Sequence, residues 1–257
     1  KNWTVWAVSA LVLGIFGYAL LLTGTRGTML GFVGGATVAV AYIALLGRKY
    51  PELRKFAIGG FLGLVILVLG FVAVKDSAYI QSNTPLSRIA NIDVAKDLET
   101  RGVIWSMALE GVKERPLLGW GQGNFNYVFN KQFEPELYSK ESWFDRVHNI
   151  VLDWLIAGGV LGFLAYVSIF VALVYYLFWL PFFKNDERMD VLERGVLLGL
   201  IVAYTLHNLV VFDNIISYIF FACVLALIHS RMSEEIEAVE KFEIEERLVS
   251  QIMAPIV

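Results

Sequence analysis

The sequence predicts an all-α integral membrane protein with about six membrane-spanning helices and one large extracytoplasmic loop. Of the 257 residues, 57% are hydrophobic and only 18% are charged, whereas soluble domains are about 45–50% apolar. The mean hydropathy is +0.62. The apolar residues also form long blocks, most of them near the roughly 20 residues that a helix needs to cross a bilayer. Composition and block length therefore place the chain among membrane proteins.

Six apolar blocks are expected to cross the membrane. They cover residues 5–22, 28–46, 56–74, 150–180, 195–212 and 215–229. The fourth block is too long for one straight crossing. We interpret it as a tilted helix that extends beyond the bilayer and is closed by Pro181, although Gly158 and Gly159 would also permit a kink.

The distribution of basic residues predicts the orientation of these spans. Segment 47–55 carries four basic residues and one acidic residue, and short loops rich in Lys and Arg stay in the cytoplasm. Alternation of the spans then places the loop 75–149 on the extracytoplasmic side. We expect residues 1–230 to form the membrane domain and residues 231–257 to form an amphipathic cytoplasmic tail.

The loop 75–149 is expected to contain a helix over residues 94–114. Asp93 is a suitable N-cap for it, and Pro116 with the glycines that follow it ends it. At helical spacing, one face collects apolar residues together with one arginine. This face consists of Val94, Leu98, Arg101, Trp105, Ala108 and Val112.

Aromatic residues crowd the second half of this loop. Two interpretations stay open: a lid that rests on the lipid headgroups, where aromatic side chains collect, or platforms on which sugars stack. The residues are Trp120, Phe125, Tyr127, Phe129, Phe133, Tyr138 and Trp143.

Several classes of function are disfavoured by the sequence. The net charge of −3 argues against a nucleic-acid partner. The single cysteine, Cys223, excludes an intrachain disulfide, and its place in an apolar run predicts a buried packing thiol. There is no zinc motif, P-loop or nucleophile elbow. Because the chain begins at Lys1, we expect it to be part of a longer protein.

Polar residues stand at the ends of the spans, where the bilayer makes them costly. Arg26 follows the first span with almost no loop, and either snorkels to the interface or binds a ligand. His148 and Asn149 stand where the loop enters the fourth span, with Asp153 one turn deeper. A histidine is a suitable general base near neutral pH, or else it anchors the loop.

A second polar group is expected at the outer end of the fifth span. His207 lies deep enough to need a hydrogen-bonding partner, and packing is a better explanation for it than catalysis. Asp213 lies just beyond it. Together with Arg26 and His148, these residues would share the outer headgroup level.

In their order and spacing, these segments resemble the O-antigen ligase and polymerase superfamily over roughly residues 5–230. The resemblance rests on three segments. They are Thr25-Arg26-Gly27 before a glycine-rich span, Arg101 with Trp105 before Pro116-Leu117-Leu118-Gly119-Trp120-Gly121-Gln122-Gly123-Asn124-Phe125, and His148-Asn149 before Gly158-Gly159-Val160-Leu161-Gly162.

The resemblance implies a membrane glycosyltransferase of polysaccharide and cell-envelope biosynthesis. Such enzymes move a glycan from an undecaprenyl-diphosphate carrier to a glycan, lipid or protein acceptor at the outer face of the bacterial cytoplasmic membrane. It implies that Arg26 and Arg101 bind the diphosphate and that His148 activates the acceptor hydroxyl. By their positions in the sequence, Asn149, Asp153, His207 and Asp213 are candidates for supporting roles. One departure is Ala157, where many relatives carry a glutamate; Asp153 is a candidate replacement.

The chemistry expected from this resemblance needs no cofactor and no metal ion. Two guanidinium groups neutralise the departing lipid diphosphate, a single displacement inverts the anomeric carbon, and the carboxylates are scattered over two helices. Sequence does not separate a ligase that builds lipopolysaccharide from a polymerase or a protein-glycosylating enzyme. A polytopic transporter is the alternative from another class, although its polar residues should lie at midplane.

Overall fold

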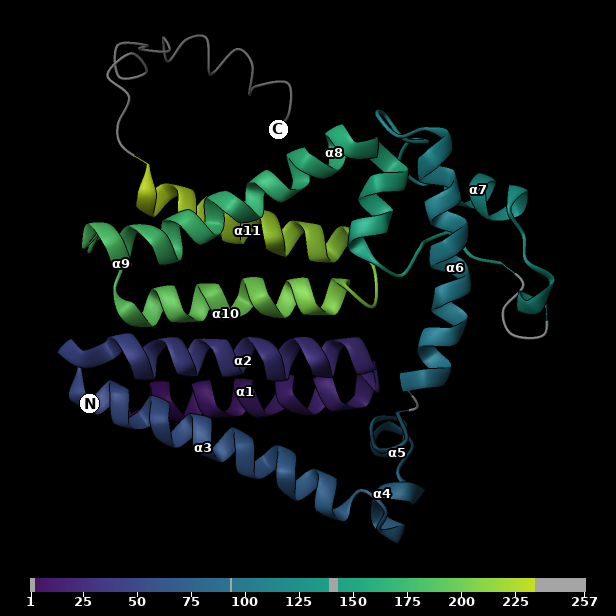
Figure 1. Cartoon of the computed structure of the whole chain (residues 1–257). Coiled ribbons are helices and arrows are strands. Elements are labelled where there is room, and N and C mark those ends of the chain that lie inside the picture. The colour runs from purple at the N-terminus through teal and green to yellow at the C-terminus, as the bar shows by residue number, and fades with distance from the viewer. Residues whose placement is uncertain (1–2, 93, 139–142, 234–257) are drawn as a thin grey trace, which may run out of the picture.

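The computed structural model describes residues 3–92, 94–138 and 143–233, and in these residues it contains helices and no strands. Five helical stretches are long and apolar enough to cross a membrane, and α10 (Val191–Asn208) runs beside them (Figure 1). The five contain α1 (Trp3–Thr23), α2 (Arg26–Leu46), α3 (Pro51–Val74), α8 (Ile150–Val174) and α11 (Ile215–Met232). The chain is therefore a multi-pass, all-α membrane protein, as the sequence predicts.

Small residues hold α2 against α10. Gly31 and Gly35 face α10 so closely that a Cβ atom on Gly31 would lie 2.6 Å from the Ala203 carbonyl oxygen, and one on Gly35 would lie 2.6 Å from the Ala203 Cβ. From the other side, a Cβ atom on Gly199 would lie 2.7 Å from the Gly35 carbonyl oxygen. Close backbone approach through glycine is the usual way in which membrane helices associate, because lipid gives them no hydrophobic reason to do so.

The fourth apolar block is a broken helix. Gly159 has φ +61° and ψ −161°, and α8 bends sharply in Figure 1. The expectation of one tilted helix is therefore wrong, and the kink that the glycines permit is the observed solution. Pro181 does not close the helix either, because a π-helical turn (η3, Tyr175–Trp179) leads into α9 (Leu180–Lys184). Pro181 therefore lies within a continuous helical stretch, directly after the π-helical turn.

The extramembrane segment is mostly helical. Its turn-rich beginning contains α4 (Ala78–Ser82) and α5 (Thr84–Ala90), and the expected helix is α6 (Val94–Glu114). After it come α7 (Phe125–Lys131) and a 3-10 turn, η2 (Pro135–Leu137). The proposed cap Asp93 lies outside the described residues.

A separate hydrophobic cluster joins α6, α7 and the start of α8. On α6 its centre is Ile104, Met107 and Ala108, so the apolar face is only partly the expected one: Trp105 and Val112 pack at its margin. Cys223, expected to be buried, is exposed on α11.

The helix connections gather at two ends of the bundle. The turn between α1 and α2, helices α4–α7 and the connection between α10 and α11 lie at one end in Figure 1, which we name the site end. The 3-10 turn η1 (Gly47–Lys49) and the loop between α9 and α10 lie at the other, where Lys49 pairs with Glu187. The polar residues expected together lie at the site end because the helices that carry them begin or end there. The 234–257 part of the expected tail lies outside the described residues.

Candidate functional site

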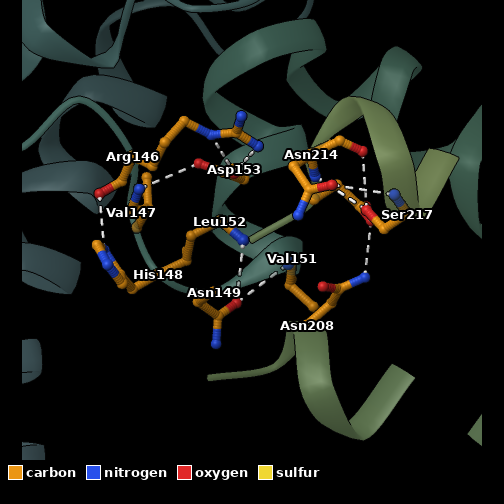
Figure 2. Close-up of polar contacts among 11 residues, drawn as sticks. Arg146, Val147, His148, Asn149, Val151, Leu152, Asp153, Asn208, Asn214 and Ser217 are labelled. Carbon is orange, nitrogen blue, oxygen red and sulfur yellow. Dashed lines mark hydrogen bonds and ion pairs between the residues drawn. The ribbon is translucent and has the colours of Figure 1, made fainter. Parts of the chain in front are cut away.

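The site is built where the loop enters α8 (Figure 2). Asn149 caps this helix: its side-chain oxygen accepts hydrogen bonds from the backbone N–H groups of Val151 (3.0 Å) and Leu152 (3.2 Å). Its side-chain N–H group donates to the Leu209 carbonyl, 3.3 Å away. The predicted supporting residue Asn149 therefore fixes the start of α8 and ties it to the end of α10.

Asp153 binds the turn that precedes α8. Its carboxylate accepts two hydrogen bonds from the Arg146 guanidinium, at 2.8 and 2.6 Å, and one from the Val147 backbone N–H at 3.1 Å (Figure 2). Burial acts to lower the pKa of Arg146, but the hydrogen bonds and charge of Asp153 outweigh it and the pKa is raised. Arg146 is therefore a fixed cation, and its carboxylate partner holds the turn against α8.

His148 sits on the turn in an unusual backbone conformation. Its φ is +56°, which is uncommon for a residue with a side chain. Residues in such backbone conformations cluster at functional sites. The ring Nδ1 lies 3.2 Å from the Arg146 carbonyl oxygen. Because a carbonyl oxygen only accepts, this hydrogen bond requires the proton on Nδ1 in the neutral ring and leaves Nε2 with a lone pair.

Two aromatic rings hold the imidazole of His148. The Phe144 ring lies 5.6 Å away and the Phe212 ring 5.0 Å away, both edge to face. The Arg146 guanidinium also lies over the Phe212 ring, 5.2 Å from the ring centroid. The connection between α10 and α11 thus contributes a wall of the site, and no motif in the sequence pointed to Phe212.

A second polar cluster lies next to this turn. The buried Asp213 carboxylate accepts hydrogen bonds from the Asn208 amide and the Ser217 hydroxyl, both at 2.9 Å. Asn214 caps α11 through a reciprocal capping box with Ser217. Asp213 also acts electrostatically on Arg146. Asp213 therefore belongs to the same end of the protein as His148 but does not contact it through any described hydrogen bond.

His207 connects the α10 end to the start of α2. Its Nδ1 lies 3.4 Å from the Thr28 hydroxyl, so the partner expected for this deep histidine is present. A Cβ atom on Gly27 would lie 2.6 Å from a methyl group of Val211. The segment 207–212 therefore runs between the start of α2 and the His148 turn.

The two predicted diphosphate-binding arginines are placed differently. Arg26 is the first residue of α2, and its Nε–H donates to the carbonyl of Arg88 on α5, 3.3 Å away. Arg101 is half-buried on α6. The structure thus brings Arg26 to the site end at the start of α2, whereas Arg101 lies within α6.

The glycine-rich segment after α6 forms backbone hydrogen bonds with the residues at the break in α8. The Trp120 and Gly121 N–H groups donate to the carbonyls of Ile156 (2.7 Å) and Ala157 (2.9 Å), and the Val160 N–H donates to the Pro116 carbonyl (2.8 Å). Two segments of the resemblance therefore pair through their backbones. In the sequence alone, these segments indicate a helix stop and a separate kink.

A small hollow lies between the glycine-rich segment and the ion pair. Gly121, Arg146 and Asp153 line it, and so does Ala157, the position where relatives carry glutamate. Arg146 was not among the predicted site residues. In the sequence, only its place two residues before His148 indicates a role.

The aromatic residues of the loop divide into two groups. Phe125 and Phe129 are buried in the hydrophobic cluster, so they do not serve as sugar platforms. Trp120 donates its ring N–H to the Gly111 carbonyl and carries the Arg115 guanidinium at 4.2 Å. Tyr127, Tyr138 and Trp143 stay exposed, and for them both the lid and the platform interpretation remain.

Two sequence comparisons bear on the family of this chain. A protein from Haemophilus influenzae described as uncharacterized is 24% identical over 213 residues, which cover 77% of this chain and 48% of that protein. The chain thus spans about half the length of the curated relative it matches. The family model described as O-antigen ligase matches residues 10–167, more than half of the chain, and includes Arg26, Arg101 and His148. The chain belongs to the O-antigen ligase family.

Proposed function

We propose that the protein is a membrane glycosyltransferase that moves a glycan from an undecaprenyl-diphosphate carrier to an acceptor hydroxyl. The observation that carries the proposal is the tautomer of His148. Its Nδ1–H is fixed on the Arg146 carbonyl, so Nε2 is the nitrogen available to accept a proton. Family membership supports the reaction type.

In the proposed reaction the acceptor oxygen attacks the anomeric carbon and the bond to the diphosphate breaks. The acceptor proton goes to Nε2 of His148, and the electron pair of the broken bond goes to the lipid diphosphate. Arg26 and Arg101 stabilise the charge that develops there, because guanidinium groups bind phosphate oxygens in a bidentate way. One displacement inverts the anomeric carbon.

Asp153 acts in this proposal through the turn rather than on the substrate. Its carboxylate holds Arg146 and the Val147 N–H, and the Arg146 carbonyl in turn orients His148. Asp153 and Ala157 line the same hollow one helical turn apart. This supports Asp153 as the replacement for the glutamate of relatives, with Arg146 as its partner.

The reaction is proposed to need no metal ion. In the described residues no group of three or more His, Cys, Asp or Glu residues is arranged to hold one. Two of the carboxylates have other partners: Asp153 binds Arg146, and Asp213 binds Asn208 and Ser217. Transfer should therefore continue after thorough chelation with EDTA. A rate that collapses and returns with Mg²⁺ would overturn this part of the proposal.

The roles are tested by transfer from a lipid-linked oligosaccharide in the purified protein. His148→Ala should lower turnover at least about 100-fold while donor binding is retained. Arg26→Lys should fail nearly as badly as Arg26→Ala, because an ammonium does not make the planar bidentate contact. Arg54→Lys, at the opposite end of the bundle, is the matched control and should leave transfer unchanged. Wild-type turnover in His148→Ala would refute the proposal.

The extracytoplasmic placement of the site is tested by cysteine labelling. In a Cys223→Ser background, Ser82→Cys should react with an impermeant thiol reagent on intact cells, and Glu52→Cys at the opposite end should react only after lysis. The reverse pattern would place the site end in the cytoplasm. The acceptor is identified in the same transfer assay by supplying glycan, lipid and peptide acceptors separately.

A further inference from the structure

A cavity lies at the end of the bundle opposite the site. Its volume is about 360 Å³, and residues from α2, α9, α10 and the loop between α9 and α10 line it. The residues that bear on its chemistry are Tyr42, Lys49, Glu187, Asp190 and Arg194. None of them takes part in the proposed transfer, so the cavity needs an explanation of its own.

Arg194 is the unusual residue in this cavity. It is only 9% exposed, in the first turn of α10. Its Nη2 donates to the backbone carbonyls of Asp186, at 2.7 Å, and Met189. Asp186 and Glu187 line the same cavity and act on it electrostatically, but among the described residues no carboxylate forms an ion pair with it. A buried guanidinium normally has an anionic partner, because desolvating an unpaired charge is unfavourable.

Two basic residues beside the cavity already have carboxylate partners. Lys49 pairs with Glu187, and Arg188 pairs with Asp186 at 2.6 Å. Asp190 lines the cavity and uses one carboxylate oxygen to cap α10, but it has no basic partner among the described residues. The backbone N–H of Arg194 donates to the Asp190 carbonyl, so the two residues lie about one helical turn apart on the lining of the cavity.

A basic and an acidic residue one helical turn apart on the lining of the same cavity fit a zwitterion. The surroundings fit a lipid: the exposed aromatic side chains of Tyr50, Trp179, Phe182 and Phe183 surround this end of the bundle, as is usual at a membrane interface. Leu46 adds an apolar lining beside the cavity.

We propose that this cavity binds the headgroup of an amine-bearing phospholipid. Arg194 meets the phosphate, and Asp190 accepts hydrogen bonds from the primary ammonium group. The acyl chains run along the apolar surfaces of α2 and α9. The site is independent of glycosyl transfer, because it lies at the other end of the molecule (Figure 1).

The test is native mass spectrometry of the purified protein after exchange into defined lipids. Phosphatidylethanolamine should be retained at least three times more often than phosphatidylglycerol, which lacks the amine, or phosphatidylcholine, whose quaternary ammonium has no N–H group. Arg194→Gln should lower retention at least threefold, whereas Arg54→Gln should not. Arg54 is the matched control because it also donates to a backbone carbonyl, that of Ala44 at 2.8 Å, and does not line the cavity.

A folding defect is separated from a binding defect with Arg194→Lys, which keeps the charge and should restore part of the retention. Soluble phosphoethanolamine should not displace the bound lipid, since it lacks the acyl chains. Equal retention of the three lipids, displacement by phosphoethanolamine, or unchanged retention in Arg194→Gln would each overturn the proposal. Transfer activity is measured in parallel and should not follow lipid retention.

Discussion

Glycine is required at two contacts in this protein, between α2 and α10 and at the break in α8, for different physical reasons. Between α2 and α10, glycines keep ordinary helical geometry and only let the backbones approach. At the break in α8, Gly159 adopts φ +61° and ψ −161°, a conformation that is essentially restricted to glycine. The first contact is a matter of space alone, and the second is a matter of both space and backbone conformation.

The difference matters because the second contact lies in the helix that carries the His148 turn. Gly159 breaks α8 six residues after Asp153, and the glycine-rich segment pairs with the exposed backbone of that break. A change there should alter the position of the first turns of α8 and with them the His148 turn. A change between α2 and α10 should affect stability first.

The largest effect is expected for Gly159→Ala. A Cβ atom there would lie 2.7 Å from the Leu118 nitrogen, and the backbone conformation would be strained as well, so we expect a loss of about 3–6 kcal/mol of unfolding free energy. Thermal unfolding in detergent measures it. The neighbouring Gly158→Ala has nothing within 4 Å and should be close to neutral. Similar losses in both variants would show that the break does not depend on Gly159.

A smaller effect is expected when the ion pair beside the break is removed. Asp153→Ala leaves the Arg146 guanidinium, whose side chain is only 19% exposed, without its carboxylate. We expect a loss of about 2–4 kcal/mol, in line with half-broken buried pairs. The control is Glu52→Ala, which removes the exposed partner of Lys55 and should change stability by less than about 1 kcal/mol. Equal losses of unfolding free energy in the two variants would show that Asp153 has no special structural role.

Gly35→Ala tests the contact between α2 and α10. Its added methyl group meets Ala203, so the helices must move apart, with an expected loss of about 1–3 kcal/mol. Gly59→Ala on α3 has open space around it and should be neutral or slightly stabilising. Transfer measured at a temperature where both variants are folded should be nearly normal, unlike in Gly159→Ala. Lost turnover in folded Gly35→Ala would mean that this contact also shapes the site.

The smallest effect is expected from pH at the opposite end. Hydrogen bonding to Arg188 lowers the pKa of Asp186. A carboxyl group with a lowered pKa contributes stability above its ordinary pKa and loses it as the pH falls through the lowered value. Between pH 5 and pH 3 the free energy of unfolding should therefore fall, and this group should account for no more than about 1 kcal/mol of the loss. Asp186→Asn should remove that component, and an unchanged pH dependence would contradict the assignment.

Local features of the site were readable from the sequence to different degrees. The helix 94–114 follows from helical spacing, and its bounds match α6. The polar residues at span ends could be found because a bilayer makes such residues unusual. The partner of Asp153 was not found, because Arg146 lies seven residues earlier and outside the helix, where spacing rules for helices say nothing.

By itself the sequence determined the class of the protein: long apolar blocks dictate membrane helices, whatever their neighbours are. It also placed Arg26, His148, His207 and Asp213 at one end of the bundle, because alternation along the chain fixes which helix ends lie together. Only the tertiary structure decided that α8 is broken and not merely tilted. The break is stable because its free backbone groups bond to the segment 116–121, which lies about 40 residues away in sequence and which no local pattern connects to it.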